Sequence, residues 1–164
     1  MRHDIFSTPV WHLEGAPQLL VDELYEQVDI IKKKKDLFDV DNHIKSNQGG
    51  YQTSQSTWES FHPDGIEYIE KLVSDIFVNW SVEVSGWWYN INCKGSWNTP
   101  HSHGGSNYAL VWYLTDSDGL LQLMNPHSNR IDIPGQDGSF DAKKGDILIF
   151  PGDIIHYVMP NTKE

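Results

Sequence analysis

The sequence has a single cysteine, Cys93, among its 164 residues. One cysteine excludes an internal disulfide and any zinc site made of several thiolates, and it is typical of a protein from a reducing compartment. The sequence also lacks an apolar run near the roughly 20 residues that a membrane-spanning helix needs. The N-terminal MRHDIFSTPVW lacks the apolar stretch of a signal peptide. We therefore expect a soluble cytoplasmic protein with no membrane partner.

Basic residues are also scarce, because the sequence holds 12 of them against 23 acidic residues, for a net charge of −11. A surface of this charge repels phosphate backbones, so the composition argues against a nucleic-acid partner. Only Arg2 and Arg130 are arginines. The one basic run, Lys32 to Lys35, is typical of the end of a helix, where cations oppose the negative end of the helix dipole.

The length fits a single domain over residues 1–164, and the sequence contains no internal repeat or linker. In the first half, residues 1–80, an opening strand is expected near residues 4–12. Apolar residues then recur at helical spacing from Ala16 to about Lys35 and from about Asp64 to Trp80. These patterns predict a strand and two supporting helices joined by a loop.

The second half, residues 81–164, changes to short β-prone runs separated by turn sequences such as DSDG, PGQDG and PGD. Many short strands closed by tight turns indicate a sandwich or barrel. We therefore predict a mainly β fold with the two helices packed on one outer face of a sheet. The predicted strands are 82–93, 101–103, 107–115, 120–124, 131–133, 139–142, 146–150 and 154–159.

Two histidines, His101 and His103, stand two residues apart in the sequence NTPHSHGGS. In a strand, residues i and i+2 point to the same face, so both imidazoles would reach one metal ion. His156 lies on a later predicted strand, behind the turn in GDILIFPGDIIH, and a rolled antiparallel sheet would return it to the pair. Three such ligands leave open positions on the metal, as in non-haem Fe(II) oxygenases.

The identity of the metal does not follow from this spacing, because imidazole suits iron, zinc, copper and nickel alike. The alternative interpretation is that His101 and His103 are loop histidines that hydrogen-bond to the backbone. A single H-x-H pair would favour that alternative, whereas the distant His156 behind its own turn favours the metal site.

Longer motifs surround these histidines. The stretch YNINCKGSWNTPHSH has the pattern N-x-N-x-x-G-x-x-N-x-x-H-x-H, a Tyr-Leu pair follows at residues 113–114, and GDILIFPGDIIHYVMPN completes the series. Together, over about residues 89–161, they resemble a family of 2-oxoglutarate- and Fe(II)-dependent oxygenases of phages and bacteria, which is similar to the prolyl-hydroxylase-like branch of that superfamily. The stretch SNQGGYQTS, residues 46–54, is similar to the family's upstream glycine loop.

The resemblance implies a double-stranded β-helix, a jelly roll shared with cupins, in which His101, His103 and His156 hold Fe(II) and are the catalytic residues. It implies that 2-oxoglutarate and O₂ take the open positions and that an unidentified peptide or small molecule is hydroxylated. If a phage encodes the protein, the compartment would be the host cytoplasm. A homodimer is left open.

By the same resemblance, Tyr113 matches a tyrosine that contacts the far carboxylate of 2-oxoglutarate. Asn98 and Asn92 are candidates for its near end, although a buried amide that is satisfied by the backbone explains both asparagines equally well. The polar, glycine-rich residues 46–55 are expected to form a mobile lid.

The sequence departs from the family pattern at two places. His103 stands where most of the superfamily has an acid. The basic residue that usually follows the distal histidine on a last strand has no counterpart before the sequence ends at Glu164. We therefore expect a β-helix core that lacks its last strand, and Arg130 is the candidate to replace that cation.

Two other functions stay open. The first is a cupin-type metal enzyme that does not use 2-oxoglutarate, since the H-x-H pair after Gly95 fits the first cupin motif. His156, after Gly145 and Pro151, fits much of the second motif, but no acid occupies residues 106–108, where a cupin has a glutamate. The second is a non-catalytic metal-binding module.

Overall fold

The computed structural model describes residues 8–33, 45–126 and 138–163. Within these residues the helices are α1 (Gln18–Lys33), the short 3₁₀ helix η2 (Trp58–Ser60) and α2 (Pro63–Ile76). The strands are β1 (Trp11–Leu13), β2 (Asn47–Gln48), β3 (Tyr51–Gln52), β4 (Asn90–Ile91), β5 (Trp97–His101), β6 (Tyr108–Trp112), β7 (Leu121–Leu123), β8 (Gly138–Phe140), β9 (Ile147–Pro151) and β10 (His156–Val158). Neither α1 nor α2 has the length and apolar character that a membrane-spanning helix requires.

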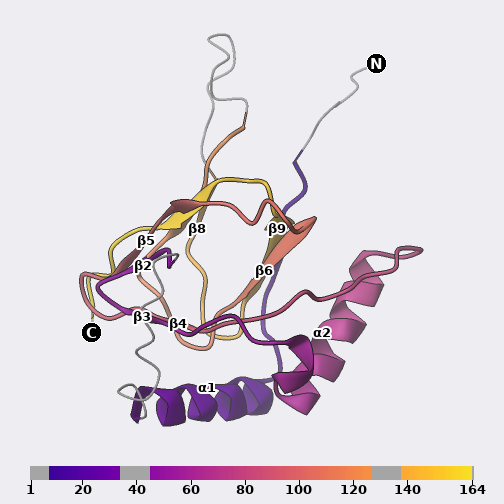
Figure 1. The fold of residues 1–164 in the computed structure, drawn as a ribbon, viewed down its shortest axis with the longest axis horizontal. Helices are drawn as coiled ribbons and strands as arrows, with labels where there is room; N and C mark the ends of the chain where they lie inside the picture. Colours follow the sequence, from indigo (N-terminus) through magenta and orange to yellow (C-terminus); the bar gives the residue numbers. More distant parts are fainter. Residues whose placement is uncertain (1–7, 34–44, 127–137, 164) are drawn as a thin grey trace.

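The strands form antiparallel sheets. Five strands pair in the order β2-β5-β10-β7-β8, three pair in the order β1-β9-β6, and β3 pairs with β4. In Figure 1 the two larger sheets stand opposite each other, with β5 and β8 on one side and β6 and β9 on the other. Two antiparallel sheets packed face to face are the arrangement expected of a jelly roll.

Apolar side chains fill the space between the two larger sheets. Leu148 and Phe150 of β9 are fully buried there, in one cluster with Leu121 and Leu123 of β7. Residues 147–150 of β9, ILIF, are buried without a break, and such a continuous apolar run is typical of a strand that is covered on both faces. β9 therefore lies at the centre of the fold.

The opposite face of β9 packs against the helices. Ile147 and Ile149 share a second buried cluster with Val21 of α1 and with Ile69 and Val73 of α2. Residues four apart lie on one side of a helix, so α2 turns one apolar stripe toward the sheet. Both helices lie along one outer side of the molecule in Figure 1. The predicted placement of two helices on one outer face is confirmed.

The second helix is shorter than predicted. It begins at Pro63, a favoured residue in a first helical turn, and it ends at Ile76 instead of near Trp80. Asn79 has a positive φ of 72°, which a helix does not tolerate and which asparagine adopts more readily than most residues. The chain therefore leaves the helix one turn early.

The predicted strand at residues 82–93 is also reduced. Only β4 and an isolated bridge between Trp87 and Ser56 pair in this stretch, and residues 81–86 pair with no strand that the structure describes. Alternation in VEVS is typical of a strand, but a strand also needs a neighbour. The predicted strand at 131–133 lies outside the described residues.

Residues 46–55, which are expected to form a mobile lid, contain two short paired strands, and their movement as a lid stays a prediction. β2 pairs with β5 and β3 pairs with β4, which ties this stretch to two sheets. Between these strands Gly49 has a φ of 76°, and a Cβ on Gly50 would overlap the backbone oxygen of Ile91. The two glycines therefore permit a tight turn that links the sheets.

The central position of Leu148 predicts that Leu148→Ala lowers the free energy of unfolding by about 2–5 kcal/mol, because it leaves a cavity between the sheets. Leu19→Ala is the matched control, because Leu19 is 73% exposed on α1 and its loss should change that free energy by less than about 0.5 kcal/mol. Urea denaturation of both variants measures the difference. Equal effects would contradict the assignment of the core.

Candidate metal centre

The register between β5 and β10 brings two predicted ligands together. His156 lies directly opposite His101, and Val158 lies opposite Asn98. β5 thus has one residue more than β10 between these pairs, which is a β-bulge, and Pro100 lies within it. Proline has no N–H for the ladder and is typical of such a site. The bulge turns both His101 and Asn98 toward the face that carries His156.

His103 reaches the same place by a different route from the one predicted. β5 ends at His101, so His103 is not on a strand and the predicted strand 101–103 is wrong in its last two residues. The backbone N–H of His103 donates to the oxygen of Gly152 at 2.6 Å. A Cβ on Gly152 would overlap the backbone oxygen of Ser106, so only glycine permits this close approach. The turn between β9 and β10 therefore positions His103.

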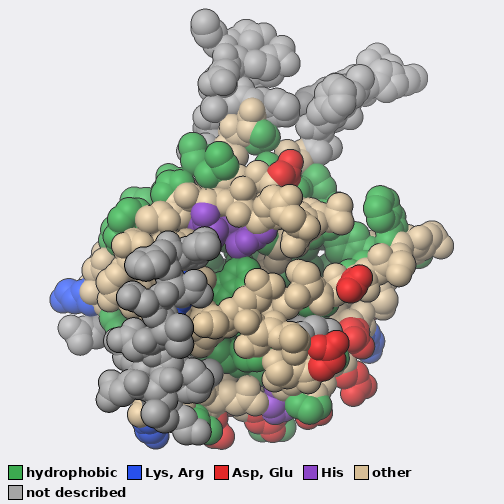
Figure 2. Space-filling model, viewed as in Figure 1, with side chains coloured by type: hydrophobic (Ala, Val, Ile, Leu, Met, Phe, Trp, Pro, Cys, Tyr) green, Lys and Arg blue, Asp and Glu red, His purple; other side chains and the backbone are tan. Residues whose placement is uncertain are grey.

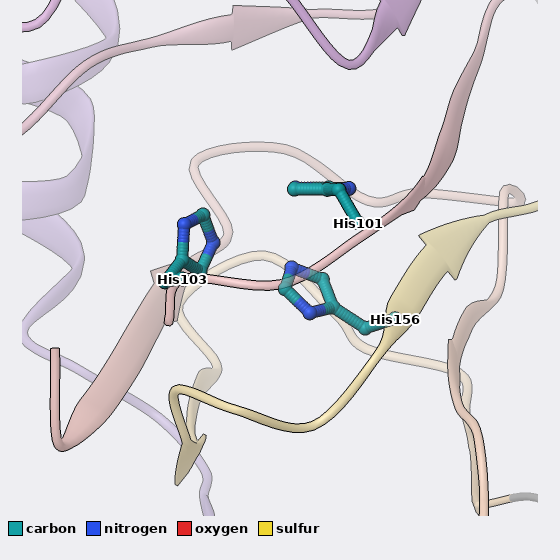
Figure 3. Close-up of side chains that lie close together, drawn as sticks. All are labelled: His101, His103 and His156. Carbon is teal, nitrogen blue, oxygen red and sulfur yellow. The ribbon is translucent and has the colours of Figure 1, made fainter. Parts of the chain in front are cut away.

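The three histidines converge on one point. One ligand atom from each of His101, His103 and His156 lies within 4.8 Å of the other two. The ring centroids are 4.2 Å apart for His101 and His156, 4.9 Å for His103 and His156, and 5.2 Å for His101 and His103. Figure 3 shows the three rings around a common space. This spacing fits three ligands of a single ion.

Backbone carbonyls select the nitrogen that each strand histidine can offer. Nδ1 of His101 lies 2.7 Å from the oxygen of Thr99, and Nδ1 of His156 lies 3.0 Å from the oxygen of Ile154. A carbonyl only accepts, so Nδ1 carries the proton and Nε2 keeps its lone pair for a metal. Metal-binding histidines generally have such a carbonyl partner, which also fixes the orientation of the ring.

Burial keeps the imidazoles of His156 and His103 uncharged. His156 is only 4% exposed, and burial lowers its pKa to about 4; the Ile154 carbonyl opposes this lowering, while His101 and His103 each add a smaller one. Burial, together with the nearby His101, also lowers the pKa of His103. At neutral pH both side chains are therefore neutral, which is the form that binds a metal.

The triad opens into a cleft. Figure 2 shows histidine side chains (purple) beside a hollow with a hydrophobic floor (green). Phe150 packs 4.9 Å from the ring of His156, and Trp88 lies 5.3 Å from the ring of His103. Sequence analysis missed Trp88 and Gly152. The Pro-Gly-Asp sequence could have indicated a turn with a close backbone approach at Gly152. Trp88 lies in a stretch with no regular structure, and no sequence pattern indicates its position.

Tyr113 lines the same cleft. It directly follows β6, and its N–H donates to the oxygen of Asp146 at 2.9 Å. Its ring packs with the cluster between the sheets, on the same face as Ala109 and Val111. Burial, and then the charge of Asp146, raises the pKa of its phenol. The hydroxyl therefore stays protonated and can donate to an anion.

Asn98 and Asn92 also line the cleft and are linked to each other. Asn92 Nδ2 donates to Asn98 Oδ1 at 3.1 Å, Asn47 Nδ2 donates to Asn92 Oδ1 at 2.5 Å, and Asn98 Nδ2 donates to Ser46 Oγ at 3.0 Å. Side chains thus satisfy both amides, and not the backbone groups of the alternative interpretation. Their contact with a cosubstrate stays a prediction.

Basic side chains are few around the cleft. Among the described residues that line it, the basic ones are Lys143 and Lys163, and Lys143 pairs with Asp141 at 2.9 Å. Arg130 lies outside the described residues, so its predicted role as a replacement cation stays a prediction.

No protein-family model matches this sequence, and no curated protein matches it. Solved structures do match its fold. A crystal structure of a Pseudomonas putida prolyl-4-hydroxylase superposes with a TM-score of 0.59 at 12% identity, over 96% of this chain and 88% of that chain. A prolyl hydroxylase in complex with a hypoxia inducible factor oxygen degradation domain peptide fragment from Trichoplax adhaerens superposes with a TM-score of 0.63 at 14% identity, over 94% and 78%.

These matches confirm the predicted fold class, because prolyl hydroxylases have a double-stranded β-helix core. At identities of 12% and 14% the likeness establishes the fold alone. The reaction has to be argued from the chemistry of the site.

The triad predicts that the protein binds one divalent transition-metal ion per chain. His101→Ala or His156→Ala should weaken this binding by at least about 100-fold, since removing a ligand costs more than disturbing its hydrogen-bond partner. Ser102→Ala is the matched control, because Ser102 lies between the two ligands and is exposed. Anaerobic titration with Co(II), with folding checked by circular dichroism, gives the affinities. An equal loss in Ser102→Ala would contradict the assignment.

The lowered pKa of His156 predicts that the metal-free protein loses stability as pH falls. An unfolded histidine takes up a proton near pH 6.5, whereas folded His156 resists protonation until about pH 4. Between these values the unfolded state binds the proton first, so the free energy of unfolding falls by on the order of 3 kcal/mol. Urea denaturation with a chelator at several pH values measures this loss. In His156→Gln the free energy of unfolding should depend less on pH. An unchanged slope in this variant would contradict the assignment of the loss to His156.

Proposed function

We propose that the protein is an Fe(II)- and 2-oxoglutarate-dependent dioxygenase that hydroxylates a peptide or a small molecule. The observation that carries this proposal is the convergence of His101, His103 and His156 inside a fold like that of prolyl hydroxylases. Three ligands on one face of a metal leave the other positions free for a cosubstrate and O₂, which is how non-haem Fe(II) oxygenases are built.

The residues fit the proposed cofactor. Imidazole suits iron, and the two hydrogen-bonded rings present their Nε2 lone pairs. When bound, Fe(II) and 2-oxoglutarate supply the oxidising chemistry: O₂ is consumed, 2-oxoglutarate becomes succinate and CO₂, and one oxygen atom is added to the substrate. The protein holds the ion, orients the cosubstrate and keeps bulk water away.

His103 gives the proposed centre an electrostatic character of its own. Three neutral imidazoles leave both positive charges of Fe(II) uncompensated, whereas a carboxylate in place of His103 would cancel one of them. The charge of a bound ion dominates the local field. We expect this centre to favour anionic oxygen ligands, which suits the carboxylate of 2-oxoglutarate.

The cosubstrate is proposed to lie between the sheets. Tyr113 would donate its phenolic proton to the far carboxylate, because its raised pKa keeps that proton in place. Asn98 and Asn92 would bind near the metal end, with their amides oriented by Ser46 and Asn47. Arg130 stays a candidate for the positive charge that a buried carboxylate needs.

The substrate class is proposed from the neighbours and from the cleft. One of the matched prolyl hydroxylases is in complex with a peptide fragment. In this chain the cleft extends from the histidines along β6 and residues 80–92, which is longer than a dicarboxylate alone would occupy. A peptide or a small molecule can therefore reach the metal beside 2-oxoglutarate.

The proposal is tested by adding Fe(II) and 2-oxoglutarate to the metal-free protein under anaerobic conditions. A visible metal-to-ligand charge-transfer band should appear, and admission of O₂ should convert 2-oxoglutarate to succinate. His101→Ala and His156→Ala should abolish both signals, while Ser102→Ala keeps them. A bound metal without the band or succinate would favour the cupin-type alternative, and no bound metal would favour a non-catalytic module.

Tyr113→Phe tests the assigned cosubstrate contact. Loss of one hydrogen bond to a charged group should raise the KM for 2-oxoglutarate about tenfold with little change in metal affinity. Tyr157→Phe is the matched control, because Tyr157 alternates with His156 on β10 and faces the outside of the sheet. A KM that changes equally in both variants would remove Tyr113 from the site.

A further inference from the structure

β6 has a free edge. It pairs with β9 at the end of the sheet β1-β9-β6, and within residues 8–33, 45–126 and 138–163 no strand pairs with its other side. At one end of β6 the backbone oxygen of Asn107 accepts a hydrogen bond from the N–H of Gly152. At the other end the N–H of Tyr113 donates to the oxygen of Asp146, so the backbone groups of both residues face β9. Hydrogen bonding alternates along an antiparallel pair. The N–H and C=O groups of Tyr108, Leu110 and Trp112 therefore point to the free edge.

The free edge borders the cleft, and the opposite wall also offers unpaired backbone. Residues 80–92 line this wall, and residues 81–86 among them form no described helix or strand. Backbone donors and acceptors require partners, and a strand that is unpaired along its length is a template for another extended chain.

The cleft presents apolar side chains along both walls. On β6 they are Tyr108 and Leu110, 38% and 37% exposed on the face turned away from the histidines, and on the opposite wall they are Trp80 and Val82, 74% and 48% exposed. β6, with the sequence YALVW, contains none of the lysines or prolines that usually block an exposed edge. Exposed apolar surface next to an unblocked edge is typical of an interaction site.

The charge of the cleft selects among partners. Among the described residues that line it, the acidic ones are Glu83, Asp116, Asp118 and Asp141, and the basic ones are Lys143 and Lys163. Because Lys143 pairs with Asp141, the excess is negative. Two copies of a chain with a net charge of −11 would repel each other here, whereas a basic chain would be attracted.

We propose that the free edge of β6 and residues 80–88 bind a basic, extended polypeptide, which adds to the sheet as a fourth strand next to β6. Main-chain hydrogen bonds provide affinity in this mode of recognition, and alternate side chains provide specificity. Ala109, Val111 and Tyr113 face the space that also holds His156. Every second side chain of the added strand therefore faces the same interior. This binding does not depend on the proposed reaction.

The test uses synthetic peptides with a central run of alternating valine and threonine. One version carries lysines at both ends, a second carries glutamates, and a third is the lysine peptide N-methylated at every second amide. Isothermal titration to the metal-free protein should show saturable binding of the lysine peptide that weakens with salt. The glutamate and N-methylated peptides should bind at least tenfold more weakly. Equal affinities for all three would overturn the proposal.

Two substitutions locate the binding. Leu110→Lys places a cation on the β6 edge and should weaken binding of the lysine peptide at least tenfold. Leu19→Lys, at a residue that is 73% exposed on α1, is the matched control and should leave it unchanged. Equal binding of the lysine peptide to the wild type and to Leu110→Lys would overturn the proposal. The proposal would also fail if the wild type sediments as a dimer that does not bind the peptide, and if Leu110→Lys dissociates that dimer, because a second copy of the chain would then occupy the edge. If Leu110→Lys does not fold, the three peptides on the wild-type protein still decide.

Discussion

The register between β5 and β10 is the constraint on which the candidate site depends. It sets His156 opposite His101 although the two residues are far apart in the sequence. A shift of one residue would turn His156 to the outer face and leave His101 without a partner. β10 is held between β5 and β7, and the turn that precedes it also positions His103 through Gly152. One local arrangement of two strands and a turn therefore assembles all three imidazoles.

The packing that positions the histidines also sets their chemistry. β9 separates the helix-facing core from the interior between the sheets, and Phe150 places an apolar ring against His156. Burial then keeps His156 neutral in a chain whose net charge is strongly negative. Neutral imidazoles in an apolar interior suit a metal cation, and the bound cation in turn attracts anionic ligands. The same interior is open beside β6, so the site and the free edge share one space.

Sequence patterns predict much of the fold and of the site. In places, however, the structure reaches the predicted arrangement by a different physical cause. The apolar run of β9 and the helical spacing of Ile69 and Val73 predict their elements because burial alone determines them. The clustering of His103 was predicted from strand alternation, whereas a turn produces it. The pairing of residues 46–55 escaped prediction because two-residue strands carry no periodicity, and the bulge at Pro100 depends on partners distant in sequence.

X-ray absorption spectroscopy of the Fe(II)-loaded protein tests most directly whether three imidazoles hold one ion. We expect three imidazole nitrogens and otherwise oxygen around the iron, with water replaced by chelating oxygens when 2-oxoglutarate is added anaerobically. His156→Ala should remove one imidazole from the spectrum or abolish iron binding. A first shell with one imidazole or none, or one that does not change when 2-oxoglutarate is added, would contradict the account.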